Sequence, residues 1–332
     1  MVRRLVGRRL VTRVLSAIAG VAVIVVGPPV RARAQLPAPT RCGVGIPSSE
    51  ASGYVPLPRG DVFCPLLADP KGQRSFVSYL RETDDDGATD LGSVGISDIF
   101  GLLRAGGSKP GNGFQISLAG SVFAQFDLNS ASYDLINADY IIGIPITMRV
   151  NGFSLRIRPY HQSSHLGDEF LLRENNPTFV RENLSFESLE GIVSLDGGPV
   201  RVYGGGEYLL RRDPADLDRS LLHGGIELRP ARRLVRFGSV AGVRFVAGGD
   251  MKASEQQDWK PSFSLRTGFE FDRPRDTDVE EGRRWGLLFE AYSAADLMHG
   301  PVAAIAEGWP VVAIAPRGPA FDVMAESIDA LK

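Results

Sequence analysis

The chain has 332 residues, 43% of them hydrophobic, and a formal net charge of −2. The nearly balanced charge gives no electrostatic basis for binding nucleic acid, and the length fits one large domain or two ordinary ones. The sequence has no P-loop, dinucleotide fingerprint or nucleophile elbow. We therefore expect no cofactor and no bound metal.

Residues 1–34 are predicted to be a cleaved secretory signal peptide. The arginine-rich stretch MVRRLVGRRLVTR precedes the apolar stretch VLSAIAGVAVIVVG, and Ala32 and Ala34 then supply small residues before Gln35. This order of basic, apolar and small residues is typical of secretion signals. A membrane anchor is the alternative, but the apolar stretch is short for a span. The mature chain is thus expected to leave the cytoplasm.

Residues 35–72 are rich in Pro, Gly and Ser and are predicted to form a periplasmic lead-in or linker. They contain the two cysteines of the chain, Cys42 and Cys64. In an oxidising compartment these cysteines could pair and stabilise the fold by roughly 3 kcal/mol. Two free thiols are the alternative, and the spacing does not indicate zinc or a redox motif.

Residues 73–292 repeatedly alternate apolar and polar side chains. In NGFQISLAGSVFAQFDL, Phe114, Leu118 and Val122 fall on one face, and Gln115 and Ser117 fall on the other. Such alternation predicts half-polar strands, and their length suits tilted transmembrane strands. Together with the secretion signal it predicts an all-β fold, an antiparallel transmembrane β-barrel of about 10–12 strands. A soluble β-sandwich is the alternative.

The polar face of this barrel is expected to line its lumen with charges of both signs. The residues expected there are Arg156, Arg158, Arg201, Glu207, Glu227, Arg229, Arg244, Arg266 and Glu270. Eight-stranded barrels are filled by side chains, whereas sixteen strands leave a channel. The sequence is therefore compatible both with a narrow selective pore and with an interior plugged by Arg–Glu pairs.

The stretch YHQSSHLGDEF contains the candidate catalytic or ligand-binding residues His161, His165, Asp168 and Glu169. A metal site or a hydrolase site would require these side chains to converge. On a straight strand the two histidines would stand about 13 Å apart. They would meet only if the chain turned sharply between them, and the alternative is a polar strand end.

Residues 293–332 lose the alternation and are predicted to form a short α/β tail. The run PVVAIAP is typical of a buried parallel strand. The following GPAFDVMAESIDALK predicts an amphipathic helix with Phe321, Met324, Ile328 and Leu331 on one face.

Two resemblances complete this interpretation. Residues 62–292 resemble an uncharacterised family of Gram-negative outer-membrane barrels, known as a domain of unknown function, through FCPLLADPKGQRSFVSY, YHQSSHLGDEF, RENLSFESLEG, RVYGGGEYLLRRDPADLD and EQQDWKPSFSLRTGFEF. The resemblance implies outer-membrane localisation, with membrane lipid and the barrel-assembly machinery as partners, and it implies no established activity.

Residues 290–332 are similar to the end of a sugar isomerase (SIS) domain, as in glucosamine-6-phosphate synthase. This resemblance implies a ring-opening role for His299 and phosphosugar binding, but the phosphate-binding loops of that domain are missing upstream. The chain is thus interpreted as a barrel whose last strands are replaced by a truncated SIS-like fragment, through either a gene fusion or an assembly error. The hypotheses are a non-enzymatic barrel acting as a narrow channel or ligand-associated scaffold, a hydrolase using the histidine cluster, and a phosphosugar-binding tail.

Overall fold

The structure is a computed structural model. It describes residues 53–84, 87–107, 109, 111–171, 184–230, 232–237, 241–272, 285–294 and 297–306. The chain divides into two compact units, Met1–Leu36 and Pro37–Lys332, and every described residue belongs to the second. The predicted signal peptide, Cys42 and the predicted C-terminal helix lie outside the described residues.

The described residues form a 15-stranded antiparallel sheet, which confirms the all-β prediction. The strands are β1 (Gly53–Pro56), β2 (Phe76–Asp84), β3 (Gly87–Gly106), β4 (Gly113–Asp127), β5 (Leu135–Gly143), β6 (Ile146–Val150), β7 (Phe153–Leu166), β8 (Leu184–Gly197), β9 (Val200–Asp213), β10 (Ser220–Leu228), β11 (Val235–Phe237), β12 (Ala241–Ser254), β13 (Pro261–Asp272), β14 (Trp285–Ala294) and β15 (Leu297–Ala306). One four-residue helix, α2 (Asp168–Leu171), follows β7, and a 3₁₀ turn, η2 (Glu255–Gln257), follows β12. None of the helices in the described ranges is long and apolar enough to cross a membrane.

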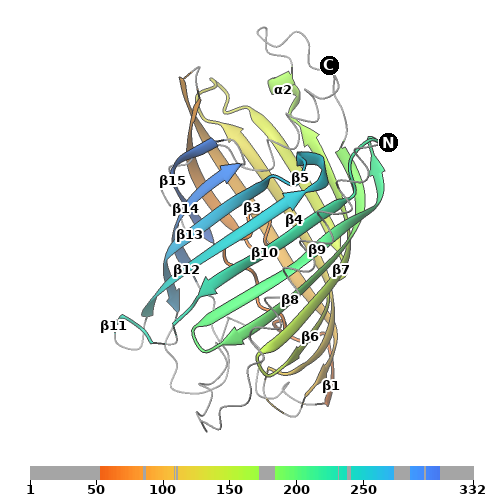
Figure 1. Cartoon of the computed structure of the whole chain (residues 1–332). Helices are drawn as coiled ribbons and strands as arrows, with labels where there is room; N and C mark the ends of the chain where they lie inside the picture. The colour runs from red at the N-terminus through yellow and green to blue at the C-terminus, as the bar shows by residue number, and fades with distance from the viewer. Residues whose placement is uncertain are drawn as a thin grey trace. The chain divides into compact units, whose positions relative to one another are not determined.

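Apart from the short strands β6 and β11, strands that follow one another in the chain pair as antiparallel neighbours from β2 to β15. Figure 1 shows β7 to β10 and β12 to β14 side by side in this order. Strand β15 then pairs with β2, with Ala303–Ala306 opposite Phe76–Tyr79. The short strands fit around this order, since β1 pairs with β3, β6 pairs with β4 and β7, and β11 pairs with β12.

The sheet has two unlike ends. At one end, β6 and β7 are joined through Asn151, which has a positive φ of 55°, and β8 and β9 are joined through Gly198, with a φ of 65°. Such left-handed residues are typical of tight hairpins. At the other end lie the connections 128–134, 214–219 and 255–260 and helix α2. We call these the turn end and the loop end.

The two faces of the sheet are inverted relative to a water-soluble protein. In β13, Phe263 and Leu265 are 50% and 55% exposed, whereas Ser264 and Arg266 are 3% and 5% exposed. The alternation predicted from the sequence therefore holds, with the polar residues buried and the apolar residues outside. We call these the inner face and the outer face.

Residues 57–75, between β1 and β2, form an irregular segment buried against the inner face; we call it the inner segment. Val62, Cys64 and Leu67 are at most 1% exposed. The sequence predicted a linker over residues 35–72, and residues 57–72 depart from this expectation. Because the segment forms no ladder of its own, it carries no periodic pattern by which burial could be predicted.

Arginines of four strands hold the inner segment by its backbone carbonyls. Arg104 Nη2 lies 2.7 Å from the oxygen of Arg59, and Arg149 Nε lies 2.8 Å from that of Val62. Arg201 Nη1 lies 2.9 Å from the Cys64 oxygen, and Arg266 Nη1 lies 3.1 Å from the Asp69 oxygen. Buried carbonyls need donors, and the guanidinium group offers five.

The ring of Phe63 anchors the middle of the inner segment between two of the buried arginines. The guanidinium carbons of Arg156 and Arg201 lie 4.9 and 4.8 Å from its centroid. Gly248 of β12 leaves room for Leu67, since a Cβ at this position would stand 3.2 Å from a Leu67 methyl carbon. The segment and the inner face are therefore fitted to each other by charge and by shape.

Strand β15 departs from the α/β tail predicted to begin at residue 293. Leu297–Ala306 instead continues the antiparallel sheet, paired with β14 and with β2. The edges of β2 and β14 offer unpaired backbone groups on both sides of this stretch, and an unsatisfied edge recruits whatever strand can reach it. Residues 307–332 lie outside the described residues.

The inner face is held by ion pairs between neighbouring strands, and Glu190 is the clearest case. Its two oxygens lie 2.8 Å from Arg156 Nε and 2.7 Å from Arg158 Nη2, and all three side chains are buried. Removing one member of such a group leaves uncompensated charge away from water.

We expect Glu190→Gln to lower the free energy of unfolding by roughly 3–5 kcal/mol. Glu187→Gln is the matched control, since Glu187 lies on the opposite face of the same strand in a half-exposed contact with His161. That exposed pair contributes at most about 1 kcal/mol. Equilibrium unfolding in urea measures both, and equal effects of the two variants would contradict the arrangement.

Candidate functional site

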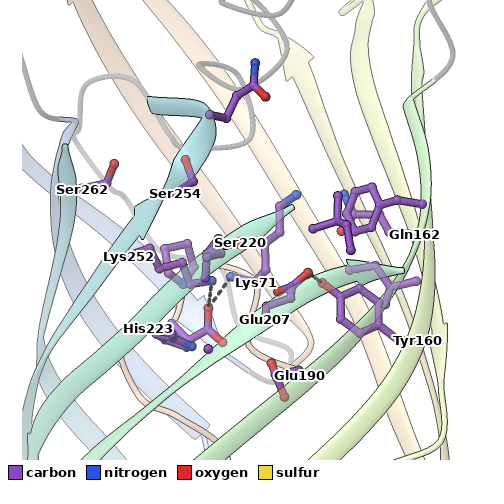
Figure 2. A pocket seen from close by; sticks show the side chains of 18 of the residues that line it. Lys71, Tyr160, Gln162, Glu190, Glu207, Ser220, His223, Lys252, Ser254 and Ser262 are labelled. Carbon is purple, nitrogen blue, oxygen red and sulfur yellow. Dashed lines mark hydrogen bonds and ion pairs between the residues drawn. The ribbon is translucent and has the colours of Figure 1, made fainter. Parts of the chain in front are cut away.

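The inner segment leaves a cavity of about 190 Å³ between itself and the loop end. Its walls come from β5, β7, β8, β9, β10, β12 and β13, and Leu217, Asp218 and Gln256 of the loops stand at its mouth. Figure 2 shows Lys71, Tyr160, Glu207 and Lys252 directed toward this space. The cavity therefore combines chain segments far apart in the sequence.

The floor of the cavity is a buried ion pair between the inner segment and β12. Lys252 Nζ lies 2.8 Å from Asp69 Oδ1, which also accepts the Lys71 backbone N–H at 3.1 Å. Burial by itself raises the pKa of Asp69, but the nearby ammonium of Lys252 outweighs it and holds the pKa below the usual range. Asp69 is thus ionised and fixed in place.

His223 and Asp250 form a second buried group beside this pair. His223 Nε2 lies 2.6 Å from Asp250 Oδ2, and the Tyr203 hydroxyl donates to the same oxygen at 2.5 Å. No hydroxyl nucleophile among the described residues is hydrogen-bonded to His223, so the pair lacks the third member that nucleophilic catalysis needs.

The nearest arrangement to a metal site is the set Asp69, His223 and Asp250, whose ligand atoms lie within 4.8 Å of one another. Lys252 already supplies the positive charge next to Asp69, and Tyr203 and His223 engage Asp250. A metal ion would have to displace the ammonium from Asp69. The geometry therefore favours a hydrogen-bonded network over metal coordination.

One wall of the cavity carries an aromatic pair and a carboxylate. The Tyr160 hydroxyl donates to Glu207 Oε1, and the ring of Phe186 meets that of Tyr160 edge to face, with centroids 6.1 Å apart. Lys71 of the inner segment reaches Asp139 of β5, with Nζ and Oδ2 3.1 Å apart. These residues line the upper part of the cavity.

The histidine cluster predicted from the sequence lies elsewhere. His161 and His165 are four residues apart in the unbroken strand β7 and alternate with the buried Gln162 and Ser164, so both lie on the outer face. His161 Nδ1 lies 3.3 Å from Glu187 Oε1, and His165 Nε2 lies 2.8 Å from Ser163 Oγ.

The strand runs on to Leu166 without the sharp turn that convergence requires. Asp168 and Glu169 begin α2 and are exposed. The structure therefore does not bring the four predicted residues into one pocket, and the hydrolase hypothesis finds no geometric basis among the described residues.

The charged residues expected on the inner face fall into two groups. Arg156, Arg158, Arg201, Glu227 and Arg266 are buried there. Glu207, Arg229, Arg244 and Glu270 are half-buried. Arg229 connects two strands, with 3.4 Å to Glu227 and 2.9 Å to Glu270.

The remaining predicted residues belong to the two ends of the chain. Cys64 is disulfide-bonded, and Cys42, the partner predicted for it, lies outside the described residues. His299 falls within β15. The phosphosugar hypothesis rests on residues 290–332, of which 307–332 lie outside the described residues, and it stays a prediction.

Sequence reasoning missed most of the cavity. The alternation did assign Glu207 to the polar face, and the same pattern along LLHGGIELR and AGVRFVAGGD assigns His223 and Asp250 to it. No local signal marked Asp69 or Lys71, because their position depends on the path of the inner segment. Their proximity to Lys252 and Asp139 arises only when the strands are assembled.

Comparison with known proteins gives one family. The family model described as "Protein of unknown function (DUF1207)" matches residues 17–295, most of the chain. The match ends close to residue 292, where the sequence loses its alternation. No curated protein and no solved structure gave a match.

The Asp69–Lys252 pair predicts an acid-sensitive contribution to stability. The pKa of Asp69 is depressed in the folded state, so this contribution is present above the unfolded value of about 3.9 and is lost as the pH falls through the folded value. We expect Asp69→Asn to cost roughly 3–5 kcal/mol at pH 7.

The difference between wild type and Asp69→Asn should shrink below about pH 4. Urea unfolding at several pH values measures it, and Asp258→Asn, at an exposed loop position, is the control. A difference that stays constant with pH would contradict the assignment.

Proposed function

The chain belongs to the DUF1207 family of proteins of unknown function, and we propose that this member is a β-barrel of the Gram-negative outer membrane, closed inside by its own inner segment. In this proposal it is a ligand-associated scaffold and not an open channel. Outer-membrane lipid surrounds it, and the barrel-assembly machinery inserts it after secretion.

The observation that carries the proposal is the exposed apolar outer face. Large apolar side chains with more than a third of their surface exposed occur on strand after strand, among them Phe100, Leu118, Val193, Ile226 and Leu265. A soluble protein rarely exposes contiguous apolar surface on this scale. A bilayer solvates such a face, and transmembrane barrels alternate apolar-out with polar-in.

Strand length and pairing support the same proposal. Strands β7, β8, β9 and β12 each have 14 residues, more than the roughly 9–11 that a tilted strand needs to cross a bilayer. The pairing of β15 with β2 leaves neither strand as a free edge there. In lipid every backbone group needs an internal partner, and a barrel supplies one.

The buried inner segment favours a closed interior over a pore. Arg104, Arg149, Arg201 and Arg266 are all engaged with its carbonyls, so these charges are not free to select ions. The remaining cavity at the loop end suits recognition of a small molecule.

We expect the full chain, expressed in a Gram-negative host, to fractionate with the outer membrane and to migrate differently on gels before and after heating. Leu265→Arg should lower its stability in lipid by roughly 2–4 kcal/mol, the cost of a cation near the bilayer midplane. Ala131→Arg, in an exposed loop, should change it by less than about 0.5 kcal/mol. Recovery as a soluble periplasmic protein would contradict the proposal.

We also expect the folded wild-type protein to give no steady ion conductance in planar bilayers. Replacing residues 59–72 with a Gly/Ser sequence of equal length should create a conducting pore, because the arginines lose the segment that fills the interior. Equal length matters, since the segment must still connect β1 to β2. A steadily open wild-type pore would refute closure by the inner segment, whether or not the replacement variant folds.

A further inference from the structure

The basic side chains that line the cavity are each matched by an acid. Lys71 pairs with Asp139 at 3.1 Å, Arg158 with Glu190 at 2.7 Å, and Lys252 with Asp69 at 2.8 Å. These pairs leave no lysine or arginine of the cavity wall available as the main partner of an incoming anion.

Glu207 is a carboxylate of the cavity wall that belongs to none of these three ion pairs. It accepts the Tyr160 hydroxyl through Oε1 and forms no ion pair with any basic residue that the structure describes. It is half-buried and lines the cavity. Its negative charge also acts on Arg158 and Lys252, which are themselves paired with Glu190 and Asp69. A cation entering the cavity could therefore form a charge-assisted hydrogen bond to Glu207.

The mouth of the cavity is acidic as well. Asp218 lies there, and burial together with the negative charge of Glu255 raises its pKa. Arg212 offsets this only in part, since the pKa of Asp218 is raised overall. A cation arriving at the loop end would therefore relieve the repulsion between Asp218 and Glu255.

Apolar and aromatic side chains complete the wall around Glu207. The ring of Phe186 stands edge to face on Tyr160, and Ile141 and Leu217 also line the cavity. Arg158 already covers one face of Tyr160, at 4.6 Å from the centroid, so Phe186 is the ring left for a ligand. Aromatic faces attract organic cations.

We propose that the cavity at the loop end binds a small organic cation, an ammonium group on an apolar body, with Glu207 as the anionic partner and Phe186 against the body. This inference goes beyond membrane insertion, since it concerns the cavity wall alone. It assigns no ligand role to Asp69, His223 and Asp250, which line the same cavity but whose charges are already engaged.

The test is calorimetric titration of the full chain in a non-ionic detergent with three probes of similar size. These are 2-phenylethylammonium, 3-phenylpropionate and 2-phenylethanol. We expect the cation to bind at least about tenfold more tightly than the anion or the alcohol. Glu207→Gln keeps the shape and the Tyr160 contact, and it should weaken cation binding roughly ten- to hundredfold, the range for a hydrogen bond to a charged group.

Glu187→Gln removes the same charge from the outer face of the neighbouring strand and should leave binding unchanged. Equal binding of cation and anion by the wild type, or unchanged cation binding by a folded Glu207→Gln protein, would overturn the inference. If that variant fails to fold, the three probes on the wild type decide alone. The heat-dependent gel shift reports separately on the barrel, so the two proposals can fail independently.

Discussion

A buried backbone without secondary structure must find its hydrogen-bond donors elsewhere, and this constraint organises the inner face. The inner segment has no ladder of its own, so Arg104, Arg149, Arg201 and Arg266 donate to its carbonyls. Arg149, Arg201 and Arg266 are in turn paired with Asp196, Glu227 and Glu290, and Arg104 donates to Gln115. The buried charges on the strands therefore match the hydrogen-bond donors that the inner segment needs.

The composition of the outer face follows from that of the inner face. Strands alternate, so a face filled with charges leaves every other residue pointing away from it. Those outward residues are apolar and exposed along most strands. The proposals for a membrane location, a closed interior and a cation cavity therefore have separate supports: the outer face, the inner segment and the cavity wall.

Period-two alternation was the local pattern from which the fold could be predicted. It predicted the all-β class and assigned Arg156, Arg201 and Arg266 to one face. It did not predict the inner segment, because an irregular chain has no period, nor β15, because Ala- and Val-rich residues become a strand when two edges are free. The candidate site was instead chosen from the composition of YHQSSHLGDEF, but His161 and His165 stand about 13 Å apart when they are four residues apart on a strand.

The contacts of the inner segment span very different distances along the chain. Leu67 and Arg266 are 199 residues apart, whereas Arg59 and Arg104 are 45 residues apart. The N-terminal part of the fold therefore cannot complete its hydrogen bonds until β13, near the other end, is in place. Closing such long loops costs entropy before any contact compensates for it. The inner segment, which is synthesised before strands β2 to β15, would thus be among the last parts of the fold to reach its native surroundings.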